Sequence, residues 1–350
     1  MTSHVLPWVA DIAVDLLRTQ RGHALLLNGP DGIGQLQLAL TVAKAWLCGA
    51  DEAVRDRGLA CGHCSACHLV DQRTHPDLRV IVPEVLREEA GFPVDESSAS
   101  GDDGKKRKPS REIKVDQVRA ALGFGELTAG LGALKVLIVH PAEAVNDVSA
   151  NALLKTLEEP QGSMRFILTT AAIHQLLPTI RSRCQTVHLT MPDPMQAQAW
   201  LVGQGVSAAD AQVLLSAAGG QPLLAQAHLA QGRTAAVWRE FPALVARQET
   251  AALAAWPLPV LVDALQRLCH DLLSVAVGAP PRYFASLSSS VPRDLGRLLP
   301  WSRDLQAWAR HAEHPWNAPL SLEAILQRSA EAVQAPDRSV KTARNVHSDA

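Results

Sequence analysis

Short apolar runs alternate with helical patterns in the first half of the chain. Residues 23–27, His-Ala-Leu-Leu-Leu, form a run that predicts a strand, and residues 35–46 carry apolar side chains at helical spacing. Further strands are predicted at 77–82, 135–139, 164–170 and 185–189, and further helices at 116–122 and 148–158. This alternation predicts a mostly parallel sheet with helices on both faces.

The strand signal disappears after residue 193, and Gly and Pro residues break the remainder into helical patterns. These helices are predicted at 195–202, 208–218, 223–231, 237–255, 260–277, 293–311 and 320–333. A chain of 350 residues is long enough for two or three domains. We therefore expect an α/β domain over 1–191, a small helical domain over 192–232 and a larger helical bundle over 233–336.

Two segments lack the apolar residues that would hold them to a core. Residues 95–111 contain Ser, Gly, Asp and a Lys-Lys-Arg-Lys run, which predicts a flexible surface loop, and we assign it no function. Residues 337–350 are predicted to form a disordered tail.

Composition narrows the functional classes. The net charge is only −2, so no global basic field marks a free-standing nucleic-acid binder. The N-terminus has no basic stretch leading into an apolar run, and no apolar segment approaches the roughly 20 residues that cross a bilayer. We expect a cytoplasmic protein without a membrane segment.

Four of the six cysteines lie close together in the sequence, at Cys48, Cys61, Cys64 and Cys67. In a reducing compartment such clustering favours a metal over disulfides, and four thiolates complete a tetrahedral zinc site. Gly62 suits the tight turn that this spacing requires. We predict a structural zinc ion, with no open coordination position for catalysis.

The spacing alone leaves other ligand sets and metals open. An iron–sulfur cluster also uses closely repeated cysteines, although the ferredoxin pattern ends in a cysteine followed by proline, which is absent here. One of three histidines could replace Cys48 as a ligand: His63, His68 or His75.

A phosphate-loop pattern follows the first predicted strand. Gly29 and Gly34 match both glycines of G-x-x-x-x-G-K-[ST], but Gln35 stands at the lysine position and Leu36 at the hydroxyl position. The lysine contacts the terminal phosphates and the hydroxyl holds magnesium, so both functions are lost. The glycines themselves are also compatible with a plain strand-to-helix turn.

The second nucleotide-binding element is altered as well. The strand 135–139 should lead into an acidic pair that holds magnesium, but the chain continues with His140 and Pro141. Glu143 comes later, and we expect it to face a different direction. The loss of all three groups predicts that the chain neither binds nor hydrolyses ATP.

Several segments together resemble the bacterial clamp-loader subunits of the AAA+ class. They are residues 23–27, the cysteine cluster followed by Thr-His-Pro-Asp at 74–77, the run Ala-Asn-Ala-Leu-Leu-Lys-Thr-Leu-Glu-Glu-Pro at 150–160, and Leu-Pro-Thr-Ile-Arg-Ser-Arg-Cys at 177–184. They cover the first half of the chain in the order of that family. The altered phosphate loop is similar to the delta-prime branch rather than to the ATP-hydrolysing gamma or tau branch.

The resemblance implies an AAA+ (RecA-like) domain with an inserted zinc module around 48–67, then a helical lid and a C-terminal collar domain. The helical second half matches by architecture more than by motif. Gly219-Gly220-Gln221-Pro222 occupies the region where ATP-binding relatives carry a nucleotide-sensing arginine, and here a proline stands instead.

The resemblance also implies partners and a role. Such a chain joins delta and three gamma or tau copies in a five-subunit ring that loads the sliding clamp onto primed DNA. The ring belongs to the DNA polymerase III holoenzyme, a nucleotidyltransferase, although no catalytic site is expected on this chain. The arginine of the Ser-Arg-Cys motif, Arg183, would reach ATP on the adjacent subunit as an arginine finger. Arg181 is the neighbouring alternative.

Two other functional classes remain open at this point. One is an active AAA+ ATPase with an unusual phosphate loop, which would turn over ATP by itself. The other is a zinc-dependent nucleic-acid-binding module, although the chain lacks the interleaved aromatic and basic residues that stack on bases.

Overall fold

The structure is a computed structural model. It describes residues 5–50, 59–92, 109–126, 128–132, 134–160, 162–287, 294–312, 314 and 317–334. Residues 95–108 of the predicted flexible loop and all of the predicted tail lie outside this part of the chain. The chain divides into two compact units, Met1–Gln196 and Ala197–Ala350.

The first unit contains one parallel sheet. Its five strands lie in the order β2-β3-β4-β1-β5, and every pair is parallel. The strands are β1 (Ala24–Asn28), β2 (Leu78–Ile81), β3 (Lys135–Val139), β4 (Met164–Thr170) and β5 (Gln185–His188). All five strands predicted from the sequence are confirmed, because buried parallel strands are continuous apolar runs.

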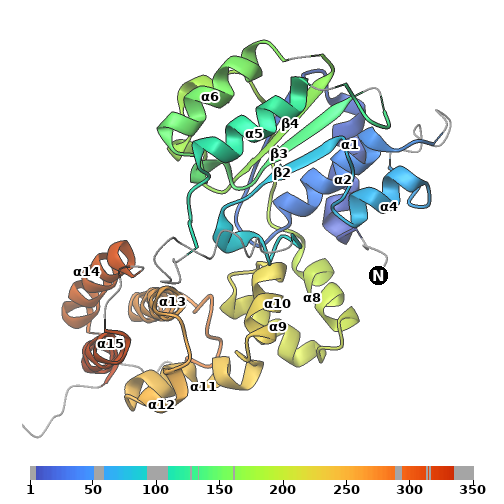
Figure 1. The fold of residues 1–350 in the computed structure, drawn as a ribbon. Coiled ribbons are helices and arrows are strands. Elements are labelled where there is room, and N and C mark those ends of the chain that lie inside the picture. Colours follow the sequence, from blue (N-terminus) through green and yellow to red (C-terminus); the bar gives the residue numbers. More distant parts are fainter. Residues whose placement is uncertain are drawn as a thin grey trace, which may run out of the picture. The chain divides into compact units, whose positions relative to one another are not determined.

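Helices cover both faces of this sheet (Figure 1). The helices and 3₁₀ turns of the first unit are α1 (Pro7–Thr19), α2 (Gln35–Leu47), α4 (Ser65–Asp71), η1 (Glu84–Leu86), α5 (Val115–Glu126), η3 (Ala142–Ala144), α6 (Asp147–Glu158), η4 (Ile173–Gln175) and α7 (Pro178–Arg181). Helices α5 and α6 pack on the face that presents Leu26, Leu137 and Phe166, and α1 and α2 lie on the other face.

Helices α1 and α4 were not predicted from the sequence pattern. Helix α1 begins at a proline in its first turn and buries Trp8, Val9, Ala13 and Leu16. The indole Nε1 of Trp8 donates to the carbonyl of Ile33 in the phosphate loop at 2.6 Å. Helix α1 therefore braces the loop that follows β1.

The second unit consists of helices. They are α9 (Ala208–Ala217), α10 (Pro222–Ala230), α11 (Ala235–Ala246), α12 (Thr250–Leu253), α13 (Leu258–Ala276), α14 (Leu295–His311) and α15 (Ala318–Val333), with α8 (Pro194–Gly203) at the boundary. One hydrophobic cluster runs through them and includes Leu201, Leu214, Trp238, Leu265 and Leu326. The division into a lid over 192–232 and a collar over 233–336 stays a prediction.

The predicted helix 237–255 is wrong as a single element. Helix α11 ends at Ala246, and α12 begins only at Thr250. Between them Gln248 has a φ of 57°, in the left-handed region that interrupts a helix. The apolar spacing continues across this break, which is why the sequence pattern did not reveal it.

Among the residues that the structure describes, helices long and apolar enough to cross a lipid bilayer are absent.

Candidate functional sites

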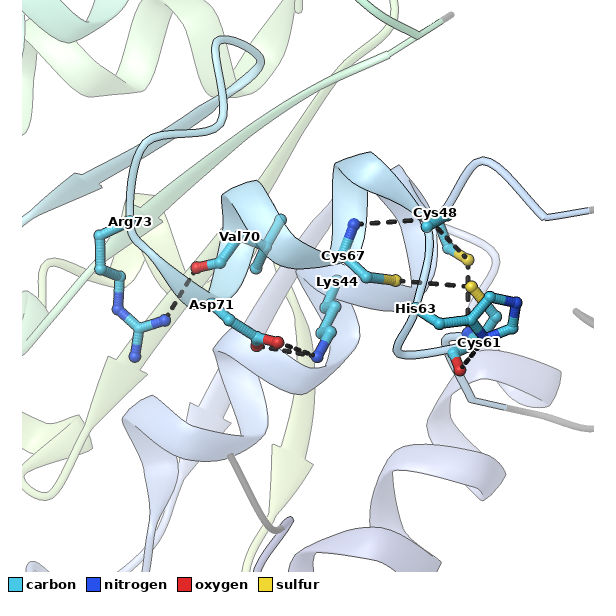
Figure 2. Close-up of polar contacts among 9 residues, drawn as sticks. Lys44, Cys48, Cys61, His63, Cys67, Val70, Asp71 and Arg73 are labelled. Carbon is cyan, nitrogen blue, oxygen red and sulfur yellow. Dashed lines mark hydrogen bonds and ion pairs between the residues drawn. The ribbon is translucent and has the colours of Figure 1, made fainter. Parts of the chain in front are cut away.

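The four predicted cysteine ligands come together in the first unit. Cys48 follows the last residue of α2, Cys64 is the N-cap of α4 and Cys67 lies in the first turn of that helix. One thiol sulfur from each of Cys48, Cys61, Cys64 and Cys67 lies within 4.8 Å of all the others. Figure 2 shows Cys48, Cys61 and Cys67 converging from separate segments of the chain. This cluster could hold a metal ion.

The spacing of the sulfurs matches tetrahedral coordination. The Sγ atoms of Cys48 and Cys64 are 3.9 Å apart, as are those of Cys61 and Cys67. A tetrahedron with metal–sulfur bonds of about 2.3 Å has edges of about 3.8 Å, whereas a disulfide bond is about 2.05 Å long. The sulfurs are therefore close enough to share one metal ion and too far apart to form disulfide bonds. All four cysteines are free thiols in this structure.

Backbone amides point at two of these sulfurs. The N–H of Cys67 donates to the Sγ of Cys64 at 3.4 Å, and the N–H of Cys61 donates to the Sγ of Cys48 at 3.4 Å. Burial acts to raise the pKa of Cys64, but hydrogen bonds from the Cys67 and Gly49 amides outweigh it and lower that pKa to about 6. Burial raises the pKa of the Cys67 thiol, because a buried thiolate is costly without a compensating charge. Four thiolates this close together would therefore need a bound cation to be stable.

The histidine alternatives do not join the cluster. His63 is exposed, and its Nδ1 contacts the carbonyl oxygen of Cys61 at 2.9 Å. His75 is buried, and its Nδ1 accepts the backbone N–H of Asp77 at 3.0 Å. His68 is exposed on α4. Within the described part of the chain, the metal-ligating cluster consists of the four cysteines.

The cluster is attached to the rest of the domain by charged contacts. Lys44 on α2 donates to both carboxylate oxygens of Asp71 on α4, at 2.8 and 2.6 Å (Figure 2). Arg73 follows α4 with a φ of 61° and donates from Nη1 to the carbonyl of Val70 at 3.0 Å. The Lys44–Asp71 contact fixes α4 against α2 and thereby positions Cys67 relative to Cys48, while the Arg73 contact closes the C-terminal end of α4.

Hydrogen bonds from the side chain of Gln35 hold the phosphate loop in its conformation. The side-chain amide of Gln35 donates to the carbonyls of Gly29 at 2.8 Å and Pro30 at 2.5 Å. Gly34 has a φ of 102°, and a Cβ there would lie 2.7 Å from Leu6, so glycine is required for both conformation and space. Leu36 is buried. The position that carries a phosphate-binding lysine in ATPases is therefore used to hold the loop together.

The end of β3 provides another internal contact instead of a magnesium ligand. The Nδ1 of His140 lies 2.6 Å from Oγ1 of Thr169 on β4. Burial lowers the pKa of His140 to about 4, although the carboxylate of Glu143 opposes the shift. His140 is therefore neutral near pH 7 and is hydrogen-bonded within the protein.

Glu143 lies in the 3₁₀ turn η3 after β3, and the expectation that it faces away from a magnesium-binding position stays a prediction. Burial raises the pKa of Asp31 in the phosphate loop, and the nearby charges of Glu143 and Glu89 raise it further. The Oε1 of Glu143 accepts the backbone N–H of Ala171, which follows β4, at 3.0 Å. A loop that would have to accept a polyanion thus carries an acidic residue of its own, Asp31, whose raised pKa reflects burial and the negative charge of two further carboxylates.

Arg183 lies between α7 and β5 in a defined hydrogen-bond network. Its Nη2 forms an ion pair with Oε1 of Glu158, the last residue of α6. Its Nη1 donates to the carbonyl of Thr179 at 2.9 Å and to Oγ of Ser182 at 3.4 Å. Cys184 packs against the hydrophobic core between the sheet and helices α5 and α6, and burial raises the pKa of its thiol to about 12.

The other residues of the motif have simpler environments. Arg181 is exposed, and its side chain makes no ion pair with any described residue. Ser182 donates its hydroxyl to the carbonyl of Thr179 at 3.1 Å. In this motif Arg183 is held by hydrogen bonds and an ion pair, and it stands between a hydrogen-bonded serine and a half-buried cysteine.

Arg183 and the phosphate loop lie at opposite ends of the sheet. The loop follows the carboxyl end of β1, whereas Arg183 precedes the amino end of β5, and these two strands are parallel neighbours. At about 3.3 Å per residue, a strand of this length separates the two ends by roughly 16 Å, more than an arginine side chain spans. Arg183 therefore cannot serve a nucleotide in the loop of its own chain.

Comparisons with known proteins agree with these features. The family model described as DNA polymerase III, delta subunit, matches residues 9–193, more than half of the chain. The DNA polymerase III subunit delta' of Pseudomonas aeruginosa is 38% identical over 256 residues, which cover 70% of this chain and 70% of that protein. The subunit delta' of Escherichia coli is 30% identical over 262 residues, which also cover 70% of this chain and 70% of that protein.

Two more distant similarities were found. The DNA polymerase III subunit tau of Escherichia coli is 29% identical over 177 residues, which cover 50% of this chain and 22% of tau. A solved gamma subunit-related protein of Thermotoga maritima aligns with 92% of this chain and 99% of its own at 17% identity, with a TM-score of 0.46. Because the family model spans the whole α/β unit up to residue 193 and the delta' relatives extend beyond it, the chain belongs to the delta-prime subunit family of DNA polymerase III clamp-loader proteins.

Proposed function

We propose that this chain is the ring member that hydrolyses no ATP and supplies Arg183 to the ATP site of a neighbouring gamma or tau subunit. The ring would contain this chain, delta and three gamma or tau copies, and would load the sliding clamp onto primed DNA in the cytoplasm during chromosomal replication. The observation that carries the proposal is the position of Arg183 at the end of the sheet opposite its own phosphate loop.

The phosphate loop supports the absence of nucleotide chemistry. Gln35 donates into the loop at Gly29, Leu36 is buried, and His140 is bonded to Thr169 where a magnesium-binding carboxylate would be needed. The carboxylates of Asp31 and Glu143 would repel a triphosphate. Pro222 begins α10 in the region where ATP-binding relatives carry a sensing arginine.

The network around Arg183 supports a role in trans. The side chain of Arg183 is 33% exposed, and its guanidinium is planar with five donors, which suits an interfacial phosphate. A guanidinium directed at the terminal phosphate offsets charge that develops during phosphoryl transfer, an effect worth roughly 10³ to 10⁵ in rate.

We assign the cysteine cluster a structural zinc ion. Cys48, Cys61, Cys64 and Cys67 would supply four thiolates, a complete shell that leaves no position for a substrate or an activated water. The ion would hold the segment between α2 and α4 in place.

The decisive experiment is a ring reconstituted with gamma or tau, delta, the clamp and primed DNA. Arg183→Ala should leave assembly unchanged by size-exclusion chromatography, because no core side chain is removed. In a single-turnover burst, about one-third of the hydrolysed ATP should be lost if one of the three sites is deprived of its finger, and clamp loading should be impaired. Arg183→Lys should rescue little, since an ammonium lacks the planar fork.

Arg181→Ala is the matched control and should leave both rates unchanged. If Arg181→Ala lowers them and Arg183→Ala does not, the finger is Arg181. If neither matters, this chain is a scaffold. ATP turnover by the isolated chain would support the active ATPase, and salt-sensitive DNA binding by the isolated chain would support the nucleic-acid-binding module.

A further inference from the structure

Glu158 is the last residue of α6, and its carboxylate pairs with the guanidinium of Arg183 although 25 positions separate them. We propose that Glu158 is the positioning residue of the arginine finger: it holds one edge of the guanidinium so that the remaining donors point outward to the phosphate of the neighbouring subunit. This inference rests on the proposed role of Arg183 and adds a second residue to it.

Stability does not explain an acidic residue at this place. The C-terminal end of a helix carries partial negative charge, so a carboxylate there is disfavoured. The side chains of Arg183 and Glu158 are 33% and 49% exposed, and ion pairs that exposed contribute little to folding. The geometry of Arg183, rather than the stability of α6, is what this contact determines.

The contacts of the Arg183 guanidinium use only some of its donors. Glu158 engages Nη2, while the carbonyl of Thr179 and the hydroxyl of Ser182 engage Nη1. A guanidinium has five N–H donors, and among the described residues nothing accepts a hydrogen bond from Nε of Arg183. Donors therefore remain for a phosphate while the contact with Glu158 is kept.

The end of α6 that carries Glu158 is itself rigid. The imidazole Nε2 of His23, just before β1, lies 2.8 Å from the carbonyl oxygen of Leu157, and Leu157 is fully buried. The ring of His23 packs edge-on against Phe166 in β4, with ring centroids 6.4 Å apart. The backbone at Glu158 is thus attached to two strands of the sheet, which gives Arg183 a fixed reference point.

Holding one long side chain in its productive orientation has a moderate effect on rate. In the reconstituted ring, Glu158→Gln should slow single-turnover hydrolysis at the site facing this chain by about 3- to 10-fold. Assembly and the ATP concentration for half-maximal rate should be unchanged, because in this proposal Glu158 acts on the nucleotide only through Arg183. Glu159→Gln is the matched control, since Glu159 is the next acidic residue and makes no ion pair with a described residue.

A double-variant cycle distinguishes positioning from a general structural role. If Glu158 acts through Arg183, Glu158→Gln should have no further effect in an Arg183→Ala background. A further loss in that background would refute the positioning role, as would an increase in rate in Glu158→Gln alone, which would make the pair a restraint. A normal rate in Glu158→Gln together with a slow Arg183→Ala would overturn this inference alone. A normal rate in Arg183→Ala would overturn the proposed function beneath it.

Discussion

The side-chain amide of Gln35 donates to the carbonyl of Gly29 at 2.8 Å, so the first residue of α2 closes the loop that precedes it. Gln35 is buried, and the same amide also reaches the carbonyl of Pro30. A phosphate would have to compete with these internal contacts and with the carboxylates of Asp31 and Glu143. The internal contacts of Gln35 thus stabilise the loop as a turn between β1 and α2.

The isolated chain should give no binding heat with magnesium-ATP in calorimetry. Restoring the motif with Gln35→Lys and Leu36→Thr together should still give no hydrolysis, because His140 occupies the place of the magnesium-binding acid and bonds to Thr169. Micromolar binding by the unmodified chain would contradict this prediction and would favour an active ATPase.

Gln35→Ala should lower the stability of the first unit. The substitution leaves the carbonyls of Gly29 and Pro30 without their donor, and an unsatisfied buried polar group costs about 1–3 kcal/mol. Urea unfolding monitored by circular dichroism measures the change. Gln37→Ala, at an exposed position two residues further along the same helix, is a suitable control and should change the free energy of unfolding by less than about 0.5 kcal/mol.

The cysteine cluster should bind one zinc ion per chain by elemental analysis. Cys64→Ser should release it, because one corner of the tetrahedral shell is lost and a hydroxyl is a poor ligand for a thiolate-bound zinc. Cys269→Ala removes a thiol in the second unit and should leave the zinc content unchanged. An unchanged zinc content in Cys64→Ser would rule out this ligand set.

The fold and the cysteine site were largely predictable because their signals are local. Buried parallel strands are continuous apolar runs, and four cysteines lie within 20 positions of one another, from 48 to 67. The order of the strands could not be read in this way, because it depends on how the connections cross the sheet. The break at Gln248 was also hidden, since the apolar spacing continues across it.

The contacts of the other sites depend on tertiary structure. The sequence singled out Arg183 but not Glu158 as its partner, because the end of α6 meets α7 only after both pack on the sheet. The contact of Glu143 with the backbone N–H of Ala171 was hidden for a similar reason, since it depends on the 3₁₀ turn η3 after β3. Motifs identified these residues, but only packing determines which of them touch.

In the second unit, Asp271 should be important for stability. This carboxylate is fully buried and accepts the backbone N–H groups of Arg282, Tyr283 and Phe284 at 2.9, 2.7 and 2.8 Å. Asp271→Ala leaves three amides without an acceptor and should cost about 3–5 kcal/mol in urea unfolding. Asp304→Asn, which loses only an exposed pair with Arg328, should cost less than about 1 kcal/mol. Equal effects of the two substitutions would show that the buried carboxylate is not an anchor.

The last prediction concerns pH and follows from the buried imidazole of His140. Burial lowers the pKa of His140 to about 4 in the folded chain, from an ordinary value of 6.5. Between these two values the unfolded chain binds more protons, so the stability that His140 contributes is complete above about pH 6.5 and is lost as the pH falls toward about 4.

The loss should approach about 1.4 kcal/mol per pH unit within that window. His140→Gln removes the titrating group, so the first unit of this variant should lose less stability between pH 7 and pH 5 than the unmodified chain. The raised pKa of Asp31 acts in the opposite direction but is present in both proteins, and therefore cancels in the comparison. Urea unfolding at the two pH values provides the measurement. If both proteins lose the same free energy of unfolding, His140 must already be free to take up a proton in the folded chain, and its contact with Thr169 would not restrict its titration.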